Sequence, residues 1–135
     1  MRSVWKWMAL SLAVVALAAC DESVTGPSVS LDKTFTVAPG DVVSIADTSV
    51  RMQFHGVEGD SRCPADAICI QGGDAIVRVS VIDGGSRRDY ELHTGSMQPV
   101  RHDELTIALV ELAPYPFSSR TIAPGDYRAS LRVTR

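Results

Sequence analysis

The sequence lacks the features on which several large functional classes depend. Both tryptophans, Trp5 and Trp7, lie at the extreme N-terminus, so the rest of the 135-residue chain has none. This weakens a carbohydrate-binding interpretation, because sugar sites usually use exposed aromatic platforms. Charged residues make up only 21% of the chain, the formal net charge is −3, and no basic cluster of the kind used by nucleic-acid binders is present. We therefore expect no nucleic-acid partner.

Catalytic signatures are also missing. The sequence contains no Gly-x-Ser-x-Gly turn, no His-Glu-x-x-His pair and no phosphate-cradling glycine-rich loop before a helix. His55, His93 and His102 are isolated, and each falls on the expected solvent face of a strand or in a loop. We interpret them as surface residues, with joint metal ligation across strands as the alternative. We expect no catalysis and no resident metal or cofactor.

The longest apolar run is too short to span a membrane. Arg2 and Lys6 precede a mostly apolar stretch at 8–18, whereas a spanning helix needs about 20 apolar residues. A basic start, a short apolar run and small residues before a cysteine are typical of an export signal. Residues 1–19 are therefore predicted to be a signal peptide.

Leu17-Ala18-Ala19-Cys20 resembles the lipobox of bacterial lipoprotein signal peptides at all four positions. The resemblance implies cleavage before Cys20, a thioether-linked diacylglycerol on its sulfur and an acyl chain on the new amine. Several chains on one residue are enough for stable anchoring in a lipid bilayer. The resemblance thus implies a bacterial envelope protein, lipid-anchored to a membrane and facing the periplasm or the exterior. The alternative is an ordinary secretory leader in which Cys20 is incidental.

The cysteine count agrees with a lipidated Cys20. Three cysteines are an awkward number for an exported protein. With lipid on Cys20, Cys63 and Cys69 are left to pair as a disulfide in an oxidising compartment. Residues 20–29 are small and polar, with Gly26-Pro27 opposing regular structure, and are predicted to be a lipidated flexible tether.

From residue 30 onward, apolar and polar side chains alternate with a period of two. The clearest run places Ala75, Val77, Val79 and Val81 on one face of a strand. Other alternating runs lie at 31–37, 43–45, 50–55, 89–93 and 127–134, and 104–112 fits a strand better than a helix because it is short and prolines follow it. The pattern predicts one all-β domain over 30–135, a small antiparallel β-sandwich of Ig-like or Greek-key type with about seven strands. We expect it to be a monomer.

Glycine and proline mark the turns. Asp83-Gly84-Gly85-Ser86 lies between two alternating runs and predicts a tight hairpin. Ala38-Pro39-Gly40-Asp41 and Ala123-Pro124-Gly125-Asp126 both have the Pro-Gly order of type II turns.

The most distinctive segment is 58–73, EGDSRCPADAICIQGG. The order of features runs from Phe54 through Asp60-Ser61-Arg62-Cys63-Pro64 and Cys69 to Gly72 or Gly73, followed by a Val-rich strand. In this order the chain resembles a loosely defined group of uncharacterised exported bacterial proteins and lipoproteins. The resemblance implies export and a shared fold and implies no activity.

Several roles are open for this cysteine loop. It can be a structural disulfide, a rigid recognition or inhibitor loop, a divalent-cation site built from carboxylates, or a redox couple. The carboxylates concerned are Glu58, Asp60, Asp66 and Asp74. The Cys63–Cys69 spacing differs from the Cys-x-x-Cys of thioredoxin-like sites, which disfavours the redox role.

The function expected from these observations is a non-catalytic binding or envelope-associated module, acting on a protein partner through loops at one end of the sandwich. The candidate contact residues are Asp60, Arg62 and Asp66 in the cysteine loop and Tyr115 and Phe117 in the loop 113–120. The alternative is a protease inhibitor that uses the loop braced by Cys63 and Cys69.

Overall fold

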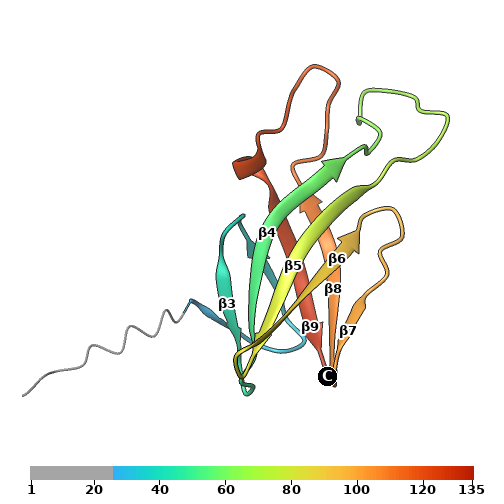
Figure 1. The fold of residues 1–135 in the computed structure, drawn as a ribbon. Helices are drawn as coiled ribbons and strands as arrows, with labels where there is room; N and C mark the ends of the chain where they lie inside the picture. The colour runs from blue at the N-terminus through green and yellow to red at the C-terminus, as the bar shows by residue number, and fades with distance from the viewer. Residues whose placement is uncertain (1–25) are drawn as a thin grey trace, which may run out of the picture.

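The computed structural model describes residues 26–135 (Figure 1). The predicted signal peptide, the predicted lipidation site Cys20 and most of the predicted tether lie outside the described residues. The strands are β1 (Ser28–Val29), β2 (Thr34–Val37), β3 (Val42–Ile45), β4 (Arg51–Asp60), β5 (Ala75–Asp83), β6 (Ser86–His93), β7 (Val100–His102), β8 (Leu105–Ala113) and β9 (Arg128–Thr134), with a short 3-10 helix η1 (Pro124–Asp126) before β9.

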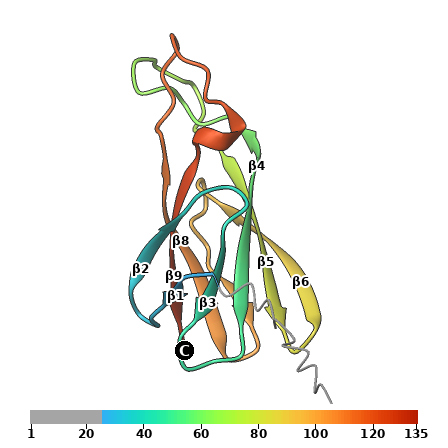
Figure 2. The same cartoon turned by 90° about the vertical axis from the view of Figure 1, so that its left-hand side faces the viewer.

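The strands form two sheets that face each other, as predicted for a small β-sandwich. One sheet has five strands in the order β1-β3-β4-β5-β6, and the other has four in the order β2-β9-β8-β7. All pairings are antiparallel except that of β1 with β3. From β2 to β9 the strands follow one another around the sandwich in chain order, and β9 closes the circuit beside β2 (Figure 2). The connections are therefore meanders, not the Ig-like or Greek-key order that we expected.

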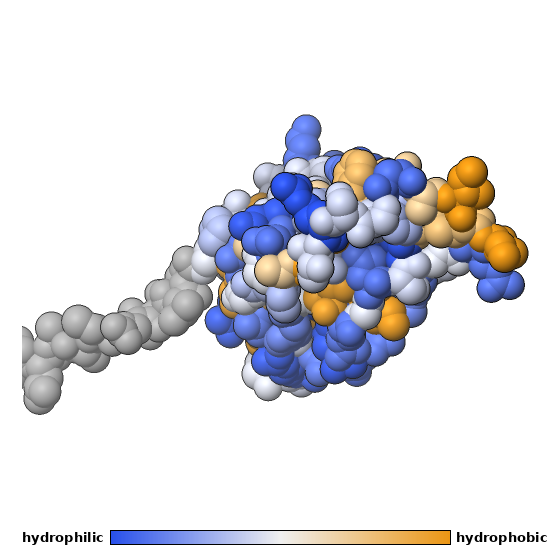
Figure 3. Space-filling view, turned by 90° about the horizontal axis from the view of Figure 1, so that it is seen from above, coloured by the Kyte–Doolittle hydropathy of each residue, from blue (hydrophilic) through white to orange (hydrophobic). Residues whose placement is uncertain are grey.

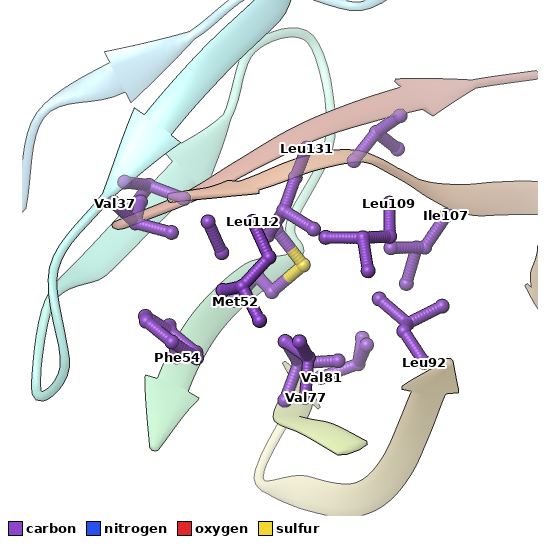
Figure 4. Packing of buried hydrophobic residues seen from close by; sticks show 14 of the residues in the cluster. Val37, Met52, Phe54, Val77, Val81, Leu92, Ile107, Leu109, Leu112 and Leu131 are labelled. Carbon is purple, nitrogen blue, oxygen red and sulfur yellow. The ribbon is translucent and has the colours of Figure 1, made fainter. Parts of the chain in front are cut away.

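The core lies between the inner faces of the two sheets, where the alternating pattern places it. Val77, Val79 and Val81 on β5 are fully buried. Leu131 on β9 lies opposite Val77 and Val81 (Figure 4). Phe54 on β4 is the largest of the fully buried side chains and is 1% exposed. Burial of such side chains stabilises a domain by about 1.5–3 kcal/mol each, which makes this layer the main source of stability.

Several strands differ from the sequence-based prediction, and β4 and β6 in particular are longer than the predicted runs 50–55 and 89–93. The strand predicted at 31–37 begins only at Thr34, because Asp32 has a φ of 61° and turns the chain. Ser28 and Val29, assigned to the tether, pair with β3 through Ser44 and Ile45, so the domain starts earlier than residue 30. The three-residue strand β7 is too short to show a period and was not predicted.

Two of the three predicted turns are confirmed. Gly40 has a φ of 93°, and the Asp41 amide donates to the Ala38 carbonyl, as a type II turn requires. Gly84 and Gly85 both have positive φ in the β5–β6 hairpin. The prediction for residues 123–126 is wrong, because Pro124–Asp126 forms the 3-10 helix η1 and Gly125 does not adopt positive φ.

The two ends of the sandwich differ in character. Two long loops, 61–74 between β4 and β5 and 114–127 between β8 and β9, extend together from one end (Figures 1 and 2). Tight turns and the end of β9 form the other end. No helix among residues 26–135 is long and apolar enough to cross a membrane.

Candidate functional site: an apolar tip on two interlocked loops

Loop 61–74 is held at its base by a close contact between its two arms. The Ser61 amide donates to the Asp74 carbonyl at 2.7 Å, and the Asp74 amide donates to Ser61 Oγ at 3.1 Å. Gly73 allows this approach, since a Cβ there would lie 1.5 Å from the Ser61 carbonyl oxygen. The loop thus leaves the sandwich as a narrow projection.

A buried ion pair joins this loop to the loop 114–127. The Arg62 guanidinium donates to both carboxylate oxygens of Asp60, at 2.8 and 2.7 Å. It also donates to the carbonyls of Leu112 at 2.8 Å and Pro114 at 2.9 Å, which are the end of β8 and the start of the second loop. The two charged side chains are only 6% and 10% exposed. Arg62 therefore holds the second loop against the first.

Aromatic side chains complete the surroundings of this pair. The Tyr127 hydroxyl donates to Asp60 Oδ2 at 3.0 Å, and the Tyr115 ring lies 5.3 Å from the guanidinium carbon of Arg62. Burial raises the pKa of Asp60, but the hydrogen bonds and the charge of Arg62 outweigh it and hold that pKa below the usual value. Burial and the Asp60 carboxylate raise the pKa of Tyr127.

A second set of bonds joins the loops farther from the sandwich. Asp66 accepts hydrogen bonds from the Ser118 amide at 2.8 Å and from its hydroxyl at 2.6 Å. These bonds, led by the one from the hydroxyl, lower the pKa of Asp66. The Ala65 amide donates to the Pro116 carbonyl at 2.9 Å. Because the two loops are hydrogen-bonded to each other far from the sandwich as well as at their base, they form one unit.

The disulfide shapes the outermost part of this unit. Cys63 and Cys69 are bonded as predicted, closing a small ring within loop 61–74. Ile68 and Ile70, on either side of Cys69, are fully exposed. On the other loop, Tyr115 and Phe117 are 54% and 47% exposed. Figure 3 looks down on this end and shows hydrophobic side chains standing out at one edge of the molecule.

We call Ile68, Ile70, Tyr115 and Phe117 the apolar tip. Exposed apolar side chains are ordinary when scattered, but here four large ones share two interlocked loops at the end of a small domain. Since the loops are already ordered by the disulfide and the bonds between them, binding through the tip would lose little conformational entropy. The arrangement is suited to recognition.

The candidate contact residues divide into two groups. Tyr115 and Phe117 lie on the surface as expected, whereas Asp60 and Arg62 are buried and Asp66 is engaged with Ser118. The charged residues of the prediction thus build the loops, and the surface they present is apolar.

The carboxylates considered for a cation site do not converge. Asp60 pairs with Arg62, Asp66 with Ser118, and Glu58 with Arg78 at 3.1 Å. Asp74 Oδ2 lies 2.5 Å from His93 Nδ1, and its Oδ1 accepts from the Gly95 amide. Each carboxylate has a different protein partner, so this loop offers no shared cation site.

One polar cluster on the outer face of the five-stranded sheet contains a serine, a histidine and an aspartate. Ser80 Oγ lies 2.6 Å from His55 Nε2 and donates to Asp89. In a catalytic triad the histidine lies between the serine and the carboxylate, but here the serine lies between the other two. Arg87 Nη2 also lies 2.7 Å from the same imidazole nitrogen. The geometry is that of a polar network on a sheet surface.

Sequence reasoning missed three residues of interest. Ile68 and Ile70 resemble ordinary hydrophobic residues in the sequence, but the structure leaves both fully exposed. The signal that could have revealed this is their position inside and directly after a ring of only five residues between two cysteines, which is too small to enclose a side chain. His102 was expected on the surface, but it is 5% exposed. It ends the short strand β7, which periodicity did not reveal.

No protein-family model, curated protein or solved structure matches this chain. Its function is therefore argued from its own residues.

Proposed function

We propose that this protein is a lipid-anchored lipoprotein of the bacterial envelope whose sandwich is a non-catalytic binding module for another envelope protein. The observation that carries the proposal is the apolar tip, four exposed hydrophobic side chains on two loops that are bonded into one unit. Large apolar and aromatic side chains at the centre of a contact supply most of the binding free energy in protein interfaces.

The charge around the tip favours a protein surface over a lipid surface. Loops 61–74 and 114–127 together carry Asp66, Asp74 and Asp126 against Arg62 and Arg120. Attachment to anionic lipid draws on an excess of basic residues, which these loops do not have. The expected partner is a protein with an apolar groove.

Site-specific photo-crosslinking in intact cells tests this function. A photoreactive amino acid at position 68 or 117 of the full chain should crosslink to one envelope protein, and the same group at exposed Glu91 on the sheet face should not. Ile68→Ser and Ile70→Ser should each weaken the interaction with that protein about tenfold or more, because each removes an apolar side chain whose burial in the contact would be worth about 1.5–3 kcal/mol. Val110→Ser changes an exposed hydrophobic residue on β8 and is the matched control.

Two results would reject the binding proposal. One is equal crosslinking from positions 68 and 91. The other is binding of the full chain to protein-free anionic vesicles that the tip variants abolish, which would make the tip a lipid-contacting surface.

The anchor has its own test. The intact mass of the protein isolated from membranes, with and without reductant and alkylation, should show acyl groups on Cys20. Cys63 and Cys69 should alkylate only after reduction. A soluble, non-acylated product would reject the anchor and leave the tip proposal standing.

A second candidate function is protease inhibition, favoured by the exposure of Ile68 and Ile70 within a disulfide-braced loop. A rigid, exposed loop of this kind can occupy the cleft of a protease with little loss of entropy. Titration against serine proteases that prefer aliphatic residues should then show inhibition that reduction of the disulfide removes. Rapid cleavage between residues 63 and 71 would reject this function.

A further inference from the structure

The end of the sandwich opposite the tip contains a pocket whose charged side chains are mostly acidic. The β3–β4 turn, the end of β5, the β7–β8 turn and the end of β9 contribute to it. Its charged lining consists of four carboxylates, those of Asp47, Asp83, Asp103 and Glu104, and one guanidinium, that of Arg135. Arg135 Nη2 lies 3.5 Å from Glu104 Oε1, and both side chains are at least half exposed, so this ion pair lies at the rim of the pocket.

His102 is the exceptional member of this lining. Its side chain is 6% exposed, and Nδ1 lies 2.9 Å from the Tyr90 hydroxyl. Nε2 is shielded from solvent and has no hydrogen-bond partner among residues 26–135. Buried polar atoms are normally hydrogen-bonded, so an unpartnered imidazole nitrogen beside carboxylates points to a missing ligand.

Two carboxylates lie within reach of that nitrogen. Asp103 Oδ2 is 3.7 Å from His102 Nε2. One ligand atom from each of Asp83, His102 and Asp103 lies within 4.8 Å of the other two. Asp83 Oδ1 accepts from Ser49 Oγ at 2.6 Å, which orients the carboxylate and leaves Oδ2 free. Within the described part of the chain this is the one group of three such side chains close enough to share an ion.

We propose that Asp83, His102 and Asp103 bind a divalent transition-metal ion of the Zn²⁺ type. A mixed set of one imidazole and two carboxylates suits such ions, whereas Ca²⁺ and Mg²⁺ prefer oxygen ligands alone. Zn²⁺ bonds of about 2.0–2.1 Å put neighbouring ligand atoms about 3.4 Å apart, so the exposed Asp103 side chain need move only slightly. Water or Glu104 can fill the fourth position.

Tyr90 is a positioning residue for this site. When His102 Nδ1–H donates to the Tyr90 oxygen, the proton is held on Nδ1 and the lone pair of Nε2 faces the carboxylates. Hydrogen bonding of the distal nitrogen in this way is a regular feature of metal-binding histidines. The T-shaped contact of the two rings, with centroids 5.9 Å apart, fixes the plane of the imidazole.

The ion would join the two sheets. Asp83 ends β5 in the five-stranded sheet, while His102 and Asp103 lie at the end of β7 in the four-stranded sheet. A ligand that binds only the folded state stabilises it in proportion to ligand concentration over Kd. Zn²⁺ should therefore raise the melting temperature.

Calorimetric titration of the full chain with ZnCl₂, after stripping with EDTA, tests the proposal. We expect one ion per chain, a higher melting temperature with Zn²⁺, and at least tenfold weaker binding in Asp103→Asn and Asp83→Asn. Asn tolerates the left-handed backbone of residue 103, where φ is 51°, so Asp103→Asn should remain folded even if His102→Phe does not. Tyr90→Phe should weaken Zn²⁺ binding about tenfold.

The matched controls are His55→Gln and His93→Gln, which change the two histidines outside the pocket and should leave Zn²⁺ binding unchanged. The proposal is overturned by a failure to bind Zn²⁺ stoichiometrically, or by binding that His93→Gln or His55→Gln removes and Asp103→Asn does not. Ca²⁺ binding that exceeds Zn²⁺ binding and is unaffected by His102→Phe would also overturn it.

Discussion

The buried pair of Asp60 and Arg62 offers the sharpest test of how the two loops are held together. In Arg62→Met the long apolar stem is kept, but four hydrogen bonds are lost, two to Asp60 and one each to the Leu112 and Pro114 carbonyls. Removing one partner of a buried ion pair leaves an uncompensated charge and costs about 3–5 kcal/mol. Since the side chains are 6% and 10% exposed, solvent screens little of this loss.

A change of this size is easy to measure in a domain of this length. At about 4 °C per kcal/mol, the melting temperature should fall by about 12–20 °C. Urea unfolding of the full chain followed by far-UV circular dichroism gives the free energy directly, and circular dichroism does not depend on tryptophan, which residues 26–135 lack. Faster hydrogen exchange in 61–74 and 114–122 should accompany the loss.

Arg78→Met is the matched control. Arg78 also pairs with carboxylates, those of Glu58 and Glu91, but its side chain is 39% exposed and theirs are 45% and 47% exposed. Exposed pairs contribute about 0–1 kcal/mol, so this variant should lose less than that. If Arg62→Met is no less stable than Arg78→Met, the buried pair does not hold the loops and the reasoning is wrong.

Three further predictions follow from single positions. The pKa of Asp60 is lower in the folded than in the unfolded protein, so its pair with Arg62 contributes stability above the unfolded pKa of about 3.9, and this contribution is lost as pH falls through the folded pKa. The difference in free energy of unfolding between the native chain and Asp60→Asn, measured with urea, should therefore shrink below about pH 4. A constant difference from pH 7 to pH 2 would contradict this. Phe54→Ala should cost about 3–5 kcal/mol in the same assay, since the side chain is 1% exposed in the core, and a loss below 1 kcal/mol would mean the core collapses around the gap. Gly73→Ala should open the base of the cysteine loop, because its Cβ would lie 1.5 Å from the Ser61 carbonyl oxygen, and hydrogen exchange at the Ser61 amide should rise while Gly72→Ala, with open space around it, leaves it unchanged.

Much of the fold could be predicted because strand periodicity directly reports which face is buried. Val77, Val79 and Val81 alternate in the sequence and are buried in the structure, and the Gly84-Gly85 hairpin follows from the tolerance of glycine for positive φ. The ambiguous segment 104–112 is a strand, as its short length indicated. The predictions that were wrong concern local structure that leaves no periodic pattern in the sequence. Strand β7 is too short to show a period, and Gly125 follows a proline in a 3-10 helix.

The candidate sites were less predictable because they are built between segments distant in the chain. Arg62 meets the Leu112 carbonyl across 50 residues, and neither residue indicates the other in the sequence. Asp83 and His102 likewise come from opposite sheets. Composition could only suggest that a loop with charged residues would bind through them.

By itself, the sequence determined the chemistry available to this protein and the β-sandwich that carries it. Alternation of apolar and polar residues determines which faces pack, and two cysteines with five residues between them determine a local ring, because both depend on positions near in the chain. Only the tertiary structure decided that Asp60 and Arg62 are buried supports, that Ile68 and Ile70 face solvent, and that His102 is enclosed beside Asp83 and Asp103. Those outcomes depend on how the two sheets and their loops pack against each other. The burial and the electrostatic surroundings of a side chain are set by neighbours that are distant in the sequence.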